Sequence, residues 1–318
     1  MTRSRAAPAG RRTPSTIMTT IEEAITHFAP VAKLVLAYTV AGLCLEAARP
    51  AQSRQPWRRI LFNLAYLPVY LTSLVVLAPA VAIWLPASPA LMSIDWTSTL
   101  AGAVAQTVIF ALAYDFFYYW WHRAQHTFAP LWAIHRLHHT EQALNVTTAA
   151  RHHWLEESLR PLVVLLPLGW LFHFQPVQCA TIGLVFAAWP FFIHLNMPLR
   201  LGPLGRLIMG PQYHRIHHSI EPQHWNRNFG AFFPAWDYLF GTRYHDDDEY
   251  PTLFAGLERR DDGALASKLT MCTFQETYAR PLYRKFMGDS PDNPRADFER
   301  RLANFDRARA AGMRVANP

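Results

Sequence analysis

The histidines of this sequence are numerous and clustered. Eight of its fifteen histidines lie in three short clusters: HRAQH at 122–126, HRLHH at 135–139 and HRIHH at 214–218. Because residues i, i+3 and i+4 share one face of a helix, the imidazoles of each cluster should project together. Neutral imidazole binds iron, zinc, copper and nickel, and eight such groups exceed the needs of one tetrahedral ion. The spacing therefore predicts two transition-metal ions.

Two further histidines stand where they could complete such a site. His153 lies in the segment ARHHWLE, and His194 lies in FFIHLN. His152 would point away from its neighbour on any regular element, so we expect only one of that pair to bind metal. A histidine-based pH sensor is the alternative for the clusters, but it does not require the same spacing three times.

Long apolar stretches must position these clusters. Residues 29–48, 60–85 and 100–121 are each about as long as a helix that crosses the hydrocarbon core, and residues 60–85 contain no charge. The shorter stretches within 161–193 predict a helical hairpin that turns at Gln175 and Pro176.

The arginine distribution orients these predicted spans. Loops 49–59 and 122–160 are rich in arginine, whereas loop 86–99 contains no lysine or arginine. The positive-inside rule places the first two loops in the cytoplasm, so every histidine cluster should lie on the cytoplasmic side. The basic first twenty residues conflict with the outside position that this topology gives the N-terminus. The conflict disappears if translation begins at Met18.

Composition agrees with a membrane protein that has polar ends. Hydrophobic residues make up 51% of the chain and charged residues 17%, which disfavours disorder and coiled coil. The net charge is +7, and because no nucleic-acid-binding motif is present, we expect a membrane surface rather than nucleic acid as the partner. We predict an all-α fold of about four membrane spans, including the hairpin, capped by a cytosolic helical histidine-rich di-metal domain. The expected parts are a flexible basic tail at 1–27, transmembrane helices at 28–121, a catalytic domain at 122–245 that includes the hairpin 161–193, and a polar cytosolic tail at 246–318.

Five segments together resemble the fatty acid hydroxylase / sterol desaturase superfamily. They are DFFYYWWHRAQH at 115–126, WAIHRLHH at 132–139, ARHHWLE at 150–156, YHRIHHS at 213–219 and NRNFGAFFPAWDYLFGT at 226–242. The third resembles the family element Arg-x-His-Pro-Leu-Glu, which pairs His153 with the family histidine and leaves Trp154 where the family has proline.

The resemblance implies an integral multi-pass membrane enzyme, in a bacterial inner membrane or the endoplasmic reticulum, that hydroxylates or desaturates a lipid such as a sterol or fatty acyl chain. It implies two non-haem iron ions and O2 as oxidant. Electrons would come from an external donor, a ferredoxin or a cytochrome b5-type reductase system, because the sequence contains no cofactor-binding fingerprint of its own. The implied metal ligands are His122, His126, His135, His138, His139, His153, His194, His214, His217 and His218.

Three further expectations complete this interpretation. Asp115 lies two helical turns before His122, and we expect it either to support a metal-bound imidazole or to have a structural role. We expect the site to open toward the bilayer, past the hairpin 161–193 and the aromatic run Phe116–Trp121. The alternative function is a histidine-rich membrane zinc protein, a hydrolase or a metal-binding protein, without redox chemistry. The candidates for the carboxylate base of such a hydrolase are Glu141, Glu156 and Glu157.

Overall fold

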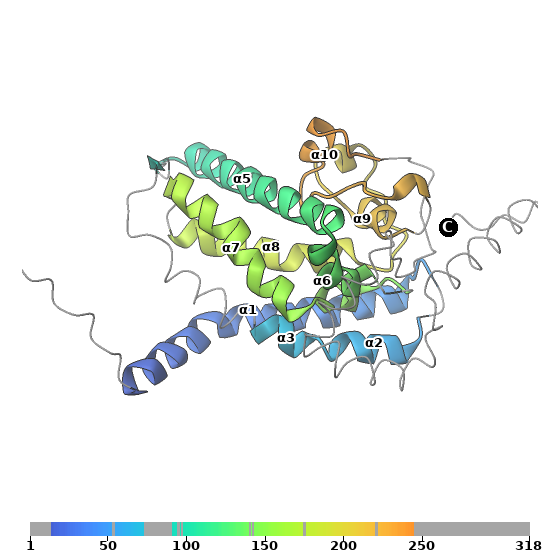
Figure 1. Ribbon diagram of the computed structural model, residues 1–318, viewed down its shortest axis with the longest axis horizontal. Coiled ribbons are helices and arrows are strands. Elements are labelled where there is room, and N and C mark those ends of the chain that lie inside the picture. Colours follow the sequence, from blue (N-terminus) through green and yellow to red (C-terminus); the bar gives the residue numbers. More distant parts are fainter. Residues whose placement is uncertain are drawn as a thin grey trace, which may run out of the picture.

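The computed structural model describes residues 14–52, 55–72, 91–93, 96, 98–139, 141, 143–173, 176–219 and 222–244. Four long helices form most of this part: α1 (Pro14–Ala48), α5 (Leu100–Thr127), α7 (Trp154–Leu171) and α8 (Pro176–Ile193). Helix α5 packs along α7, and α1 packs along α8 (Figure 1). The N-terminus of α5 is capped by Thr99, whose hydroxyl accepts a hydrogen bond from the backbone N–H of Gly102.

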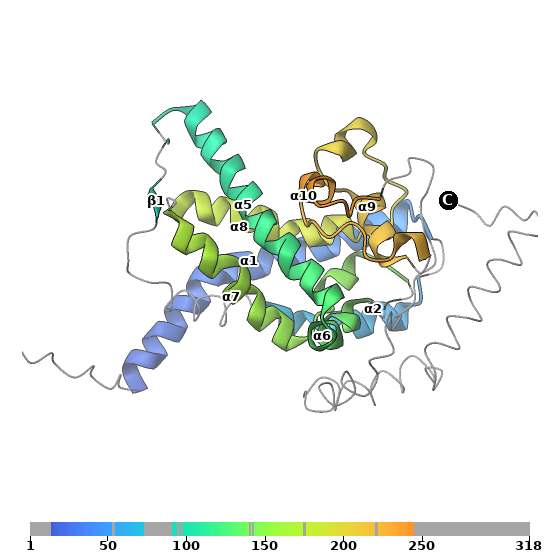
Figure 2. The ribbon, with the colours of Figure 1, turned by 45° about the horizontal axis from the view of Figure 1, so that its top comes forward.

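One end of this bundle is closed by a very short sheet. Strand β1 (Met92–Ser93) pairs in parallel with β2 (Phe172–His173), which follows α7 directly. Figure 2 shows β1 at the opposite end of the bundle from α6, α9 and α10. Between these ends, Phe110 of α5 and Leu168 of α7 pack together with aromatic side chains of α5, α8 and β2.

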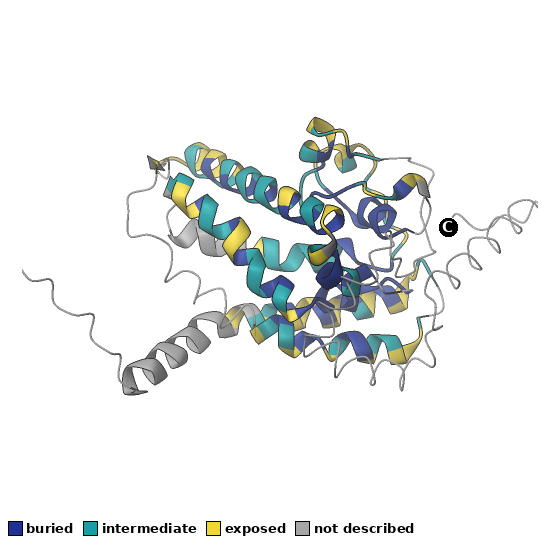
Figure 3. Ribbon diagram, in the orientation of Figure 1, coloured by how far each residue is buried: buried dark blue, intermediate teal, exposed yellow. Residues whose placement is uncertain are grey.

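The shorter elements gather at the other end of the bundle. They are α2 (Trp57–Leu64), α3 (Leu67–Thr72), α6 (Ala129–His139), η2 (Val146–Ala150), η3 (Gly202–Arg206), α9 (Pro211–His218), η4 (Pro222–His224) and α10 (Ala235–Leu239). Figure 3 shows that α6 and α9 are buried while the remote ends of α5 and α7 are more exposed. A small core formed by α1, α3, η2 and α8 supports this end, with Val35, Tyr70, Val146 and Phe191 at its centre.

The prediction of a mostly helical chain is confirmed, and the only strands among the described residues are two residues long. Helix α5 is the one helix of the described part that is long and apolar enough to cross a membrane. The predicted number of spans and the cytosolic cap stay predictions. The described part of the predicted span 60–85 is divided between α2 and α3, and residues 73–85 and the tail 246–318 lie outside the described residues.

Candidate metal centre

The three histidine clusters meet at the buried end of the bundle. The last turns of α5 supply the first cluster, α6 supplies the second and α9 supplies the third. His194 joins them from the residue directly after α8. Each of these nine histidines is buried, with at most 7% of its surface exposed. Elements far apart in the sequence thus bring nine imidazoles into one place, as the sequence predicted.

The first group contains five histidines whose ring nitrogens lie within 4.8 Å of one another: His122, His126, His135, His139 and His217. The Nε2 atom of His135 lies 3.2 Å from that of His122 and 3.1 Å from that of His139. The Nε2 atom of His217 lies 3.2 Å from that of His139. The Nε2 atoms of the group therefore converge on a common point.

The second group contains four histidines: His138, His194, His214 and His218. The Nε2 atom of His194 lies 3.1 Å from that of His138 and 2.9 Å from that of His214. The Nε2 atoms of His214 and His218 are 3.1 Å apart. Two ligands at right angles on a metal with bonds of about 2.1 Å are themselves about 3.0 Å apart, so these separations fit a shared metal ion.

Helices α6 and α9 each contribute to both groups. On α6, His135 and His139 belong to the five-histidine group, whereas His138 belongs to the four-histidine group. On α9 the pattern is reversed, because His214 belongs with the four-histidine group and His217 with the five. Residues i and i+4 lie on one face of a helix, and the residue at i+3 is displaced around it. Each HxxHH motif thus contributes histidines to both groups.

Hydrogen bonds at the opposite ring nitrogen fix several imidazoles in place. The Nδ1–H groups of His122 and His217 donate to the carbonyl oxygens of Phe229 and Arg227, each at 2.8 Å. His194 donates to the carbonyl oxygen of Pro190 at 2.6 Å. Since a carbonyl oxygen only accepts, Nδ1 carries the proton and Nε2 presents its lone pair to the group. This is the tautomer that metal binding through Nε2 requires.

Burial favours the neutral form of five of these imidazoles. Burial and the repulsion of neighbouring imidazoles hold the pKa values of His138, His139, His214 and His218 well below the usual value. Burial lowers the pKa of His194 to about 3. Neutral imidazole is the metal-binding form, so the site is ready to bind metal at neutral pH.

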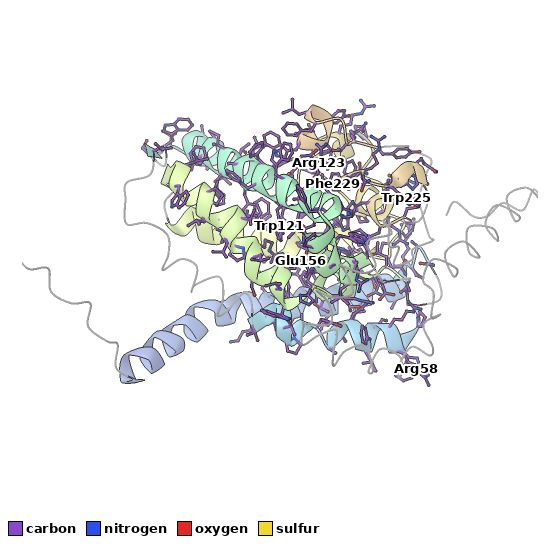
Figure 4. The ribbon with its side chains drawn as sticks, in the orientation of Figure 1. Arg58, Trp121, Arg123, Glu156, Trp225 and Phe229 are labelled. Atoms are coloured by element: carbon purple, nitrogen blue, oxygen red, sulfur yellow. The ribbon has the colours of Figure 1, made fainter. Side chains whose placement is uncertain are left out.

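A buried carboxylate supports the five-histidine group. Glu156 of α7 accepts from Nδ1 of His135 at 2.9 Å and lies 3.2 Å from Nδ1 of His152. Burial alone would raise the pKa of Glu156, but His135 and His152 hold it well below its usual value, so the carboxylate is ionised. Figure 4 shows Glu156 within the helical bundle, far from the exposed Arg58 of α2. The sequence suggested Glu156 only as a hydrolytic base, and its place in ARHHWLE is the signal for this orienting role.

His153 is the one predicted ligand that the structure does not bring to either group. Its ring caps the N-terminus of α7, where Nδ1 accepts a hydrogen bond from the N–H of Leu155 at 3.2 Å, and it stacks on Trp154. His152 lies on the other side of the chain, where its ring stacks on His138 with the ring centres 4.3 Å apart. His152 also forms a smaller cluster with His135 and Glu156. The chain is irregular before α7, so the alternation expected from a regular element does not decide which ring faces the site.

Asp115 contacts a backbone segment rather than an imidazole. Its carboxylate is fully buried and accepts the N–H groups of Ala231, Phe232 and Phe233 at 2.8–3.0 Å. No direct hydrogen bond from Asp115 to a histidine is found among the described residues.

The remaining histidines do not join the two groups within the described part of the chain. His224 is buried beside Tyr244. The side chains of His27 and His173, to which the sequence assigns no role, and the whole of His245 lie outside the described residues.

The fold and the site define a helical protein with two adjacent, buried groups of imidazoles that could each hold a metal ion. Residues 107–242 match the fatty acid hydroxylase family. The resemblance drawn from the histidine motifs is therefore confirmed over this part of the chain.

Proteins of known activity are similar to the same region. Alkylglycerol monooxygenase of Xenopus tropicalis is 32% identical over 138 residues, which cover 41% of this chain and 29% of that protein. Ornithine lipid hydroxylase OlsE of Rhizobium tropici is 34% identical over 137 residues, which cover 43% of this chain and 41% of that protein. Very-long-chain aldehyde decarbonylase GL1-6 of Oryza sativa subsp. indica is 26% identical over 170 residues, which cover 48% of this chain and 25% of that protein.

These matches cover less than half of each relative's length. No solved structure matches the chain. By name, the first two relatives are a monooxygenase and a lipid hydroxylase, and they do not favour the alternative of a zinc protein without redox chemistry.

Proposed function

We propose that this protein is a membrane-bound two-iron oxygenase that hydroxylates a lipid with O2 and electrons from a separate donor. The observation that supports this most is the division of nine buried imidazoles into groups of five and four. Tetrahedral zinc sites use four protein ligands, or three where the site is catalytic. A group of five nitrogen ligands suits a metal of higher coordination number, and two adjacent groups suit a two-metal oxidant.

The donor set fits iron, and the family relationship favours it. His122, His126, His135, His139 and His217 would hold one ion, and His138, His194, His214 and His218 would hold the other. When bound, the two irons would supply the redox chemistry that activates O2 and oxidises an unactivated C–H bond. The overall reaction consumes the lipid, one O2, two electrons and two protons, and it yields the alcohol and one water.

The chain's own residues would exclude water and hold the metals. The rings of Trp132 and Phe229 pack against histidines of the five-histidine group, so aromatic side chains line this group. Glu156 and the carbonyl oxygens of residues 227 and 229 would keep three ligands in their binding orientation. The protein thus positions the metals while they supply the oxidising power.

A membrane location explains the exposed apolar face of α5. Only 11% of the most apolar stretch of this helix is buried, whereas the core helix of a soluble protein would be mostly covered. Leu100, Val104 and Val108 are about half exposed or more. Near the other end of α5, Tyr118 contacts the ring of His122, at 5.6 Å between ring centres. An apolar substrate that follows α5 from the bilayer would therefore reach the metals without crossing water, as leaving the membrane costs about 0.8 kcal/mol per CH2.

The test is oxygen transfer by the purified protein. The full chain in lipid nanodiscs is loaded with Fe(II), reduced through a ferredoxin and its reductase, and supplied with 18O2. Ether lipids, ornithine lipids and free fatty acids are offered, and products are identified by mass spectrometry. We expect an 18O-labelled alcohol in one lipid class and loss of product in His138→Ala and His217→Ala, each of which removes one ligand. A protein that retains only zinc, or a product without 18O, would refute the proposal.

A further inference from the structure

Two buried carboxylates hold one backbone segment against the five-histidine group. The segment is residues 229–233, between α9 and α10. Asp237 of α10 accepts the N–H groups of Phe229 and Gly230 at 2.8 and 2.9 Å. Asp115 of α5 accepts the next three N–H groups, at 2.8–3.0 Å. Five consecutive backbone donors therefore point at two carboxylates, both with no exposed surface.

The same region presents its carbonyl oxygens to two metal-binding histidines. Phe229 accepts from Nδ1 of His122, and Arg227 accepts from Nδ1 of His217. Both histidines belong to the five-histidine group. The phenyl ring of Phe229 also lies against the rings of His122 and His217, with centres 5.7 and 5.9 Å away. The position of this segment thus sets the orientation of two ligands.

The segment is closely packed at Gly230. A Cβ atom on Gly230 would lie 2.3 Å from Cε of Met209 and 2.7 Å from the carbonyl oxygen of Phe233. Asp237 is itself held by the hydroxyl of Thr242 at 2.7 Å. Asp115 lies on the helix that also bears His122, so this carboxylate ties the segment directly to a ligand helix.

The four-histidine group has a different support. The carbonyl oxygen of Pro190, which belongs to α8, accepts from Nδ1 of His194. Nδ1 of His138 and Nδ1 of His214 have no hydrogen-bond partner among the described residues. The carbonyl oxygens of residues 227 and 229 thus accept from ligands of the five-histidine group, whereas no such bond from this segment to an imidazole of the four-histidine group is found among the described residues.

We infer that Asp115 and Asp237 are positioning residues that set the metal affinity of the five-histidine group through residues 227–233. The inference rests on the proposed function only in that the groups bind iron. Replacing either carboxylate by the amide of equal size turns an NH2 group toward backbone N–H donors. The segment should then shift. The carbonyl oxygens that accept hydrogen bonds from Nδ1 of His122 and His217 should shift with it. Removal of such indirect support typically weakens metal binding about 10–100-fold.

The experiment measures the two iron-binding steps separately. Full-length protein in detergent is titrated anaerobically with Fe(II) against a competing chelator. We expect Asp115→Asn and Asp237→Asn each to weaken one step about 10–100-fold and to leave the other within about twofold. His217→Ala marks the step of the five-histidine group, and His218→Ala marks the other step. The matched control is Glu141→Gln, because Glu141 is fully buried and its hydrogen bonds go to Arg59, Asn63, Arg151 and the N–H of Ala143.

Hydrogen exchange of the metal-free protein gives a second measurement. The amides of residues 229–233 should exchange faster in both aspartate variants and at an unchanged rate in Glu141→Gln. If an asparagine variant does not fold, Thr242→Val tests the same step more gently, because it removes one hydrogen bond to Asp237.

The outcomes separate the two proposals. Weakening of the step that His217→Ala marks supports the inference. Equal weakening of both steps, or of neither, overturns it. If the wild-type protein binds two irons but oxygenates no lipid, the proposed function is overturned. The iron titrations of the aspartate variants then still decide whether Asp115 and Asp237 set the affinity of the five-histidine group. A wild-type protein that binds no iron overturns both.

Discussion

Replacing Glu156 by glutamine should weaken one metal position and leave the other intact. Glu156 accepts from Nδ1 of His135 at 2.9 Å, and its Oε1 also lies 3.2 Å from Nδ1 of His152. An ionised carboxylate makes its imidazole partner a better electron donor to a metal, and a neutral amide does not. The Nε2 atom of His135 lies within 3.2 Å of those of His122 and His139, so we expect the loss of affinity in the five-histidine group.

The expected magnitude follows from what the substitution changes at His135 and His152. The glutamine side chain keeps one oxygen acceptor and removes the charge from a position shared by these two buried imidazoles. An effect of about 10–100-fold on metal affinity is typical for one such partner, which corresponds to about 1.4–2.7 kcal/mol. We expect this range for the metal of the five-histidine group and a change of less than about twofold for the other.

A neighbouring glutamate provides the control. Glu157 is buried like Glu156 and also forms an ion pair, but its partner is Arg160. Glu157→Gln thus breaks a buried pair on the same helix, and its nearest imidazole is His152 at 3.8 Å. Fe(II) titration of both variants in detergent, with iron counted per chain, tests the reasoning. Equal loss in both variants, or unchanged binding in Glu156→Gln, would refute it.

Three further outcomes are expected. His152→Ala should lower iron content and product formation more than His153→Ala, because only His152 faces the groups; the reverse order in a paired assay would contradict this placement. Gly230→Ala should destabilise the protein by about 1–3 kcal/mol, since its Cβ would meet atoms at 2.3 and 2.7 Å, whereas Gly205→Ala meets only one atom, at 3.7 Å, and should change unfolding little. The metal-free protein should lose stability as the pH falls from about 6.5 toward 3, because unfolded imidazoles bind protons there while buried ones with lowered pKa values do not; denaturant unfolding at several pH values that showed no loss would contradict this.

The convergence of the clustered histidines could be predicted because helical spacing determines which side chains project together. Nine of the ten predicted ligands do meet. Their division between two metals could not be predicted, because it depends on how α6 and α9 face each other. Sequence spacing places His138 beside His135 and His139. In the structure, however, the ring of His138 contacts those of His194 and His218 and belongs to their group.

The hydrogen-bond partners of Asp115 could not be predicted, because they are distant in the sequence. Asp115 lies two turns from His122 on one helix, and this spacing suggested a direct contact. In the structure the carboxylate binds N–H groups more than a hundred residues away, and it reaches His122 only through that segment. No periodicity within α5 contains this information. The motif NRNFGAFFPAWDYLFGT contained the other half of the arrangement, because it holds both the segment and Asp237.

The lone pairs at the centre of the site lead us to expect that bound metal stabilises this end of the bundle. In each group several Nε2 atoms face one another at about 3 Å, and where Nδ1 carries the proton these nitrogens have none to share. Burying unpaired acceptors costs free energy. A metal ion in each group turns these repelling lone pairs into bonds. Metal binding should therefore supply part of the folding free energy of the end of the bundle formed by α6 and α9.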